Sequence, residues 1–264
     1  MSGPAVDGHA PGEPVATAAP GHGLTGIADA GAFLARLTRL DPTAVVRLRP
    51  AGPAGRTTLW ARLPWAVLVG RTVAGPGPGD VTVSAATLLA ELARDGAGLP
   101  PRRDADWRWP LPPSAGELVD TMPGSDVRRI AAAAAGTLRD AAEHGVAGRA
   151  VGQRMLRDAL LDHVAVVVTR SSPAGPPGRF EVSQRLVQAV VRMGFLGPAA
   201  TPLEAAVSTS VEAAGPGSVG QIGPDGVQVR AVGRWTGLSA PFGVAWALRA
   251  SQLSITPIRD PLNG

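Results

Sequence analysis

The sequence predicts an α+β protein made of two small α/β domains with mainly antiparallel sheets, preceded by a disordered N-terminal tail. Segments with the alternating pattern of strands and segments with helical spacing occur in both halves of the chain. The 34 glycines and 26 prolines among 264 residues divide these segments into many short elements. We expect a tail at 1–26, a first domain at 27–98, a Trp/Pro-rich connection at 99–124 and a second domain at 125–258.

The first domain begins with an amphipathic helix at 28–40, in which apolar residues from Phe33 to Leu40 follow helical spacing. Asp41-Pro42 ends this helix. Ser84 is a favourable N-cap for a second helix, which we expect to end near residue 93. Between the helices, alternating patterns bounded by turn residues predict four strands, at 44–49, 57–63, 66–73 and 81–83.

The connection at 99–124 is rich in proline and holds two tryptophans. We expect it to pack against the folded domains through Trp107 and Trp109. Ser114 followed by Glu117 matches a capping box, which predicts a short helix ending at Pro123.

The second domain combines helices and strands in the same manner. Helical spacing predicts helices at 126–144, 150–161, 183–193 and 242–250. Alternating or apolar runs predict strands at 164–170, 180–182, 227–232 and 234–238. Two helices before the helix at 183–193 and strands after it resemble, in outline, a winged-helix arrangement.

Missing residue types exclude several kinds of chemistry. Cysteine and tyrosine are absent, and all 25 positively charged side chains are arginine. Disulfides, thiolate nucleophiles, Walker phosphate loops and Schiff bases are therefore excluded. No residues stand out as catalytic, cofactor-binding or metal-binding, so we predict a non-enzymatic binding or regulatory protein without cofactors. An enzyme of unrecognised type remains an alternative.

One glycine motif matches a dinucleotide-binding fingerprint in its letters. Gly21, Gly23 and Gly26 have the G-x-G-x-x-G spacing. The fingerprint requires a strand before the first glycine, whereas here a Pro-rich tail precedes it. We therefore do not interpret the motif as a cofactor site.

The most distinctive candidate site is a basic sheet face in the first domain. Alternation places Arg47 and Arg49 on one face of their strand. In the next strand, Trp60 and Arg62 share a face, so pairing of the two strands brings all four side chains together. Guanidinium groups beside an aromatic ring suit a single-stranded or phosphate-bearing ligand.

A second candidate surface lies on the helix predicted at 183–193. Arg185, Gln188 and Arg192 follow one side of it, opposite the apolar residues. Arginine and glutamine are side chains that read base edges from a recognition helix. We therefore predict DNA or RNA as a partner for both surfaces.

Both groups also have structural explanations. A solvated sheet face, or one that docks on the second half, explains the first group, and an amphipathic helix packed on a sheet explains the second. The net charge of +4 permits an anionic partner but does not require one. A protein-interaction or homo-oligomeric scaffold therefore remains an alternative to nucleic-acid binding.

The N-terminal residues lack the basic and apolar regions of a signal peptide. The apolar runs are too short to span a bilayer. We expect a cytoplasmic protein that makes no membrane contact.

Three segments resemble a family of uncharacterised actinobacterial proteins. They are LWARLPWAVLVGRTV at 59–73, EVSQRLVQAVVRMGFLG at 181–197 and RWTGLSAPFGVAW at 234–246. The resemblance covers two consecutive segments of the chain and implies no assigned activity. It also implies a source with a GC-rich genome, which agrees with the use of arginine in place of lysine.

Overall fold

The computed structural model describes residues 21–52, 55–113, 116–145, 153–170, 178–198 and 226–249. The elements of the first half are α1 (Ile27–Leu40), β1 (Val45–Pro50), β2 (Arg56–Arg62), β3 (Leu68–Ala74), β4 (Val81–Ser84), α2 (Ala85–Ala93) and the 3-10 turn η1 (Asp104–Asp106). Those of the second half are β5 (Glu117–Pro123), α3 (Gly124–His144), α4 (Gln153–Asp162), β6 (Val164–Arg170), β7 (Gly178–Ser183), α5 (Gln184–Arg192), β8 (Gly226–Val232), β9 (Trp235–Ala240) and β10 (Gly243–Leu248).

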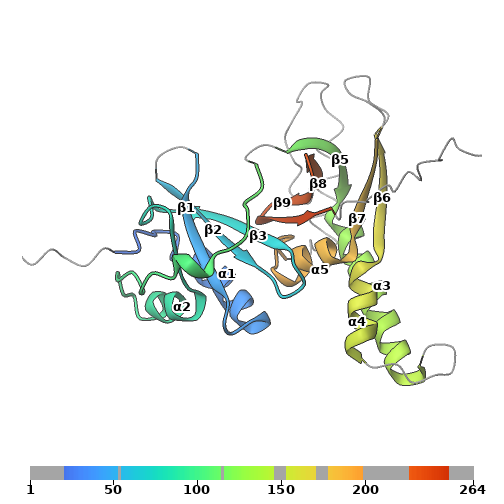
Figure 1. The fold of residues 1–264 in the computed structure, drawn as a ribbon, viewed down its shortest axis with the longest axis horizontal. Coiled ribbons are helices and arrows are strands. Elements are labelled where there is room, and N and C mark those ends of the chain that lie inside the picture. The colour runs from blue at the N-terminus through green and yellow to red at the C-terminus, as the bar shows by residue number, and fades with distance from the viewer. Residues whose placement is uncertain are drawn as a thin grey trace, which may run out of the picture.

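Strands from both halves form one antiparallel sheet in the order β4-β1-β2-β3-β10-β9-β8-β5 (Figure 1). The halves join where β3 pairs with β10, with Gly70 opposite Val244 and Leu68 opposite Trp246. Among the described strands, β6 and β7 pair only with each other. The predicted α+β class with antiparallel sheets is confirmed, and the two halves share a single sheet.

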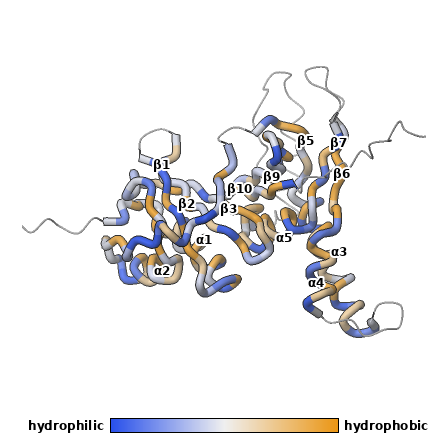
Figure 2. The backbone as a smooth tube through the Cα atoms, in the orientation of Figure 1, coloured by the Kyte–Doolittle hydropathy of each residue, from blue (hydrophilic) through white to orange (hydrophobic). Residues whose placement is uncertain are grey.

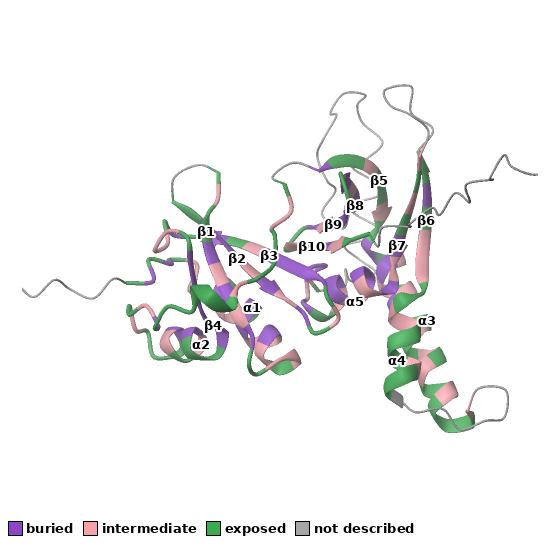
Figure 3. Ribbon diagram, viewed as in Figure 1, coloured by how far each residue is buried: buried purple, intermediate pink, exposed green. Residues whose placement is uncertain are grey.

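Helices α1, α2 and α5 cover one face of this sheet, which we call the helix face (Figures 1 and 3). The other face is called the outer face. Buried residues from both halves form a continuous core under the helices. Phe33 of α1 stacks on Phe195, which follows α5, with ring centres 6.4 Å apart. Arg71 of β3 adds a polar link, since it donates to Asp29 of α1 at 2.5 Å and to the Phe242 carbonyl at 2.6 Å.

Helices α3 and α4 extend away from the sheet (Figure 1). Only the start of α3 is buried, at Val127 and Ala131, and most of the remaining residues are exposed or half-buried. Apolar and polar segments alternate along both helices, as Figure 2 shows. Within the described ranges, no helix has the length and apolar character needed to cross a membrane.

Two predicted helices are strands in the structure. Residues 117–123 form β5, which pairs with β8 instead of forming a capped helix; Ser114 of the expected cap lies outside the described residues. Residues 243–248 form β10, because this segment lies between two strands and hydrogen-bonds to both β9 and β3. Pairing on both edges outweighs the weak helical preference of a short Ala-containing segment.

The described part of the chain begins at Gly21, inside the tail expected at 1–26, and residues 1–20 lie outside it. The buried His22 donates through Nε2 to the Gly96 carbonyl at 2.8 Å, and its Nδ1 accepts from the Leu24 N–H at 3.0 Å. A Cβ atom at Gly23 would lie 3.2 Å from the backbone of Gly77. The glycines of the fingerprint-like motif therefore serve close backbone packing. The other expected domain limits stay predictions.

Candidate functional site

The outer face carries the four residues that the sequence places together on β1 and β2. Arg47 lies opposite Trp60, and Arg49 lies opposite Thr58. Arg62 follows Trp60 by two residues and therefore shares its face. We call Arg47, Arg49, Trp60 and Arg62 the arginine face. The intervening apolar side chains of both strands are buried under the helices.

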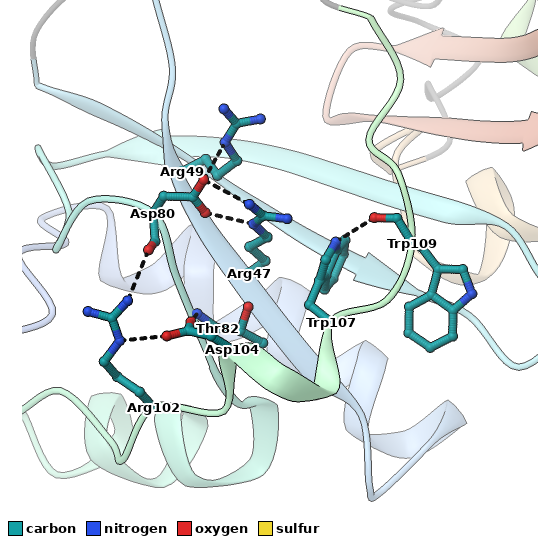
Figure 4. Close-up of polar contacts among 8 residues, drawn as sticks. All are labelled: Arg47, Arg49, Asp80, Thr82, Arg102, Asp104, Trp107 and Trp109. Atoms are coloured by element: carbon teal, nitrogen blue, oxygen red, sulfur yellow. Dashed lines mark hydrogen bonds and ion pairs between the residues drawn. The ribbon is translucent and has the colours of Figure 1, made fainter.

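Asp80, in the loop before β4, neutralises part of this charge (Figure 4). Its carboxylate accepts hydrogen bonds from Nε and Nη2 of Arg47 at 2.6 and 2.8 Å, and it lies 3.2 Å from Nε of Arg49. The bond from Arg47 lowers the pKa of Asp80 and raises that of the Arg47 guanidinium. One carboxylate serves two guanidinium groups, so this corner keeps a positive charge.

The chain after α2 is anchored along the edge of β4 (Figure 4). The Arg103 N–H donates to the Thr82 carbonyl at 2.7 Å. Asp104 accepts from the Thr82 N–H at 2.7 Å and from Nε of Arg102 at 2.7 Å. The backbone bond from Thr82, followed by the bond from Arg102, lowers the pKa of Asp104. This anchoring closes one edge of the sheet and sets the starting point of the connection.

The connection then crosses the outer face, where Trp107 and Trp109 lie beside residues of the arginine face. The guanidinium carbon of Arg47 lies 5.7 Å from the ring centre of Trp107, and that of Arg62 lies 4.5 Å from the ring centre of Trp109. Nε1 of Trp107 donates to the Trp109 carbonyl at 2.7 Å (Figure 4). Burial lowers the pKa of Arg62. Trp109 remains 37% exposed, so part of its ring faces solvent.

Large indole rings also lie flat on glycines of the outer face. A Cβ atom at Gly70 would lie 2.8 Å from the Trp60 ring, and one at Gly237 would lie 2.4 Å from the Trp246 ring. Trp246 packs with Leu68 and neighbouring apolar side chains in a second hydrophobic cluster. Alternation within single strands does not predict this layer. The sequence feature that predicts this layer is a glycine inside one strand and a tryptophan on the neighbouring strand.

The second predicted group, on α5, lies on the helix face. Arg185 donates to Asp162 at 2.7 Å and to the Trp65 carbonyl at 2.8 Å. Gln188 is 3.5 Å from the Ala131 carbonyl of α3 and accepts from Nε of Arg192 at 3.2 Å. All three side chains contact the protein itself, and they lie in a different layer from the arginine face.

The packing of α5 differs from the winged-helix arrangement that the sequence suggests. Leu186 and Val190 are buried against the sheet, and α3 lies beside the helix. A recognition helix must present a face that fits the major groove. Here, contacts with the sheet, α3 and Trp65 surround most of α5, and Arg192 is its exposed cation.

The outer face offers cations, hydrogen-bond donors and aromatic rings on one accessible surface. Such a surface binds anionic ligands and flat rings. In the described ranges, no three side chains of His, Cys, Asp or Glu type come together as a metal site requires.

The fold and this surface define an antiparallel α+β protein with an arginine- and tryptophan-lined outer face. The chain belongs to the family described as Domain of unknown function (DUF8185), which matches residues 111–252. Residues 24–110 match a second description, Domain of unknown function (DUF8010). The expected membership of an uncharacterised family is confirmed, and the two matches agree with a two-domain chain. They meet within the connection, just after Trp109.

Solved structures similar to this chain include DNA polymerase III beta subunits. That of Thermotoga maritima has 11% identity and a TM-score of 0.42, covering 86% of this chain and 63% of its own. The Pseudomonas aeruginosa sliding clamp has 9% identity and a TM-score of 0.44, covering 88% and 65%. The Streptococcus pyogenes subunit has 9% identity and a TM-score of 0.44, covering 84% and 62%. This chain thus spans less than two thirds of each. No curated protein matches it.

Proposed function

We propose that this protein is a non-enzymatic, cytoplasmic binding protein that binds nucleic acid, and single strands in particular, through its outer face. The observation that carries the proposal is the alternation of guanidinium and indole groups across β1, β2 and the connection. Stacking on aromatic side chains and ionic contact with phosphates are the two interactions that hold single strands without reading sequence.

The charge of this surface favours an anionic partner. Three carboxylates lie in it, namely Asp80, Asp104 and Asp106. Five arginines lie around them: Arg47, Arg49, Arg62, Arg102 and Arg103. Arg108, between the two tryptophans of the connection, is exposed. Within the described residues, no carboxylate pairs with Arg62 or Arg108. The excess of positive charge lies beside the exposed ring of Trp109.

In this proposal the exposed side chains have a different role from those that make internal contacts. Arg47 and Trp107 hold the surface together, because both make short internal contacts. Arg49, Arg62 and Arg108 supply phosphate contacts, and the solvent-facing side of Trp109 stacks on a base. Arg185, Gln188 and Arg192 of α5 have a structural role in this proposal.

Fluorescence anisotropy with labelled single- and double-stranded DNA tests the proposal. The variant Arg49→Ala/Arg62→Ala/Arg108→Ala should weaken single-strand binding about tenfold or more, and should reduce the slope of log K against log salt by about 2. The matched control Arg39→Ala/Arg94→Ala/Arg129→Ala removes three exposed arginines elsewhere and should leave both quantities nearly unchanged. No binding at micromolar protein, or equal losses in the two variants, would overturn the proposal.

A protein-interaction scaffold is the second candidate. β5 lies at one end of the sheet, and among the described strands it pairs only with β8. Leu118 on this strand is 48% exposed. An open sheet edge accepts a strand from a partner or from a second copy. A dimer in sedimentation experiments that Leu118→Lys dissociates, together with absent DNA binding, would favour this function.

A further inference from the structure

A pocket of about 830 Å³ lies in the second half of the molecule, apart from the arginine face. Its walls are strands β6 and β7, the start of α5, the turn between β8 and β9, and the end of β10. β7 contacts both α5 and β9 in this region (Figure 1). Residues that are distant in the sequence therefore converge on one concave site.

Four arginines from four different elements line the pocket. They are Arg179, Arg185, Arg234 and Arg249. Two carboxylates accompany them: Asp162 lies 2.7 Å from Arg185, and Glu181 lies 3.4 Å from Arg179. Within the described residues, no carboxylate pairs with Arg234 or Arg249. The lining therefore carries a net positive charge, held by these last two arginines.

Arg249 is held in place for binding. Its Nη2 donates to the Gly233 carbonyl at 2.6 Å, and its guanidinium carbon lies 5.6 Å from the ring centre of Phe180. A guanidinium has five N–H donors, so most of those on Arg249 remain available to a ligand. Arg234 lies next to Gly233 on the same turn and is exposed.

Neutral donors add to this charge. Ser183, the N-cap of α5, lines the pocket, and its side chain makes no capping hydrogen bond. The first-turn N–H groups of a helix favour an anion. Independently, Thr236 lines the pocket with only 2% exposure, and its hydroxyl has no hydrogen-bond partner among the residues that the structure describes. A buried hydroxyl without a partner is costly, which favours a ligand that supplies one.

We propose that this pocket binds a small phosphate-bearing ligand, with Arg234 and Arg249 as its principal cationic contacts. The bidentate guanidinium geometry suits phosphate oxygens, and Thr236 and Ser183 supply hydroxyl contacts. The pocket lies on the helix-face side of the sheet, because Thr236 is paired with Ala231 and Ala247 rather than with the outer-face tryptophans. This ligand is therefore separate from the nucleic acid proposed for the outer face.

Isothermal titration of the full chain with pyrophosphate, at fixed ionic strength, tests the proposal. We expect saturable binding that Arg234→Ala/Arg249→Ala weakens about tenfold or more. The control Arg154→Ala/Arg157→Ala removes two exposed arginines of α4 and should retain the affinity. Sulfate and inorganic phosphate at the same ionic strength separate recognition of pyrophosphate from general anion binding.

Arg249 also packs on Phe180, so its loss can disturb the fold. The single variant Arg234→Ala avoids this disturbance of the fold, because Arg234 is exposed and makes no ion pair in the described chain. It should keep the unfolding temperature of the original protein and still weaken pyrophosphate binding severalfold. The proposal would be overturned if millimolar pyrophosphate gave no saturable heat of binding. It would also be overturned if Arg234→Ala and Arg234→Ala/Arg249→Ala both kept the original affinity. Unchanged DNA binding in these variants would keep this result separate from the test of the outer face.

Discussion

The two arginine groups of this protein lie on opposite sides of one sheet, and they contact different kinds of neighbour. On the outer face, Arg47 and Arg62 lie beside the rings of Trp107 and Trp109, with solvent next to them. On the helix face, Arg185 bridges Asp162 and the Trp65 carbonyl between packed elements. One group is a layer added on top of the sheet, whereas the other is part of the packing between sheet and helices.

The difference shows that an arginine's role depends on its exposure and on the groups it contacts. The residue type alone does not separate an arginine of a binding surface from one that stabilises the fold. An arginine that donates to a backbone carbonyl in a partly buried position stabilises the fold, because its loss leaves that carbonyl unpaired. An arginine that lies under a ring at the surface keeps donors free for a ligand. Substitutions in the two regions measure this difference as changes in the free energy of unfolding.

The largest effect is expected for Gly237→Ala. The added Cβ would lie 2.4 Å from the ring of Trp246, which is 7% exposed and cannot move freely. Overpacking of this kind costs about 1–3 kcal/mol. Gly136→Ala is the control, because nothing lies within 4 Å of a Cβ there, and alanine should stabilise α3 by up to about 1 kcal/mol. Equal stability of the two variants in urea unfolding would show that the outer layer is loosely packed.

The next effect is expected for Arg185→Ala, which should lower the free energy of unfolding by about 2 kcal/mol. It removes the hydrogen bonds at 2.7 and 2.8 Å and leaves the Trp65 carbonyl without this donor. Arg49→Ala on the outer face should change stability by less than about 0.5 kcal/mol, since exposed ion pairs contribute little. Urea unfolding measures both, and similar losses would erase the distinction between the two faces.

Most elements of the fold could be predicted from the sequence because their patterns are local. Periodicity fixes α1 and the strands of the first half, and the hydroxyl of Ser84 caps α2 by accepting from the Thr87 N–H at 3.3 Å, as expected. The two helices that prove to be strands, β5 and β10, depend on partners far away in the chain. β10 becomes a strand because β3 and β9 offer it two edges, and no local pattern encodes that choice.

The candidate site was predictable in part for the same reason. Alternation within β1 and β2 places Arg47, Arg49, Trp60 and Arg62 on one face without any long-range information. Their partners could not be predicted, because Asp80 and the two tryptophans of the connection reach the face only through the tertiary fold. On α5, the same Arg/Gln pattern occurs in a packed helix, so spacing alone cannot separate base reading from helix packing.

A smaller effect is expected for Trp109→Ala, about 0.5–1 kcal/mol. Its ring covers the guanidinium of Arg62 at 4.5 Å, but it is 37% exposed, so less area is lost than for a buried tryptophan. Trp109→Phe keeps a ring over Arg62 and should restore most of the stability. Chemical unfolding of the three proteins provides the measurement. A loss as large as that of Gly237→Ala would place Trp109 in the core layer rather than on the binding surface.

The smallest effect is the contribution of surface carboxylates to acid stability. Arg47 lowers the pKa of Asp80 on the outer face, and Arg185 lowers the pKa of Asp162 on the helix side. A carboxylate whose folded pKa is depressed stabilises the protein above its unfolded pKa of about 3.9, and this contribution is lost as the pH falls through the folded pKa. Because both groups are largely exposed, each effect should stay below about 1 kcal/mol and weaken with salt.

Asp80→Asn and Asp162→Asn separate these two contributions. Unfolding free energies measured from pH 7 to pH 3 should show a flatter acid dependence in both variants, and the flattening should be larger for Asp80→Asn. Asp80 serves two arginines, whereas Asp162 serves one and is 65% exposed in its side chain. A larger flattening for Asp162→Asn would mean that the helix side holds the stronger charge pair. The outer-face arginines would then be freer for a ligand than the contacts of Asp80 indicate.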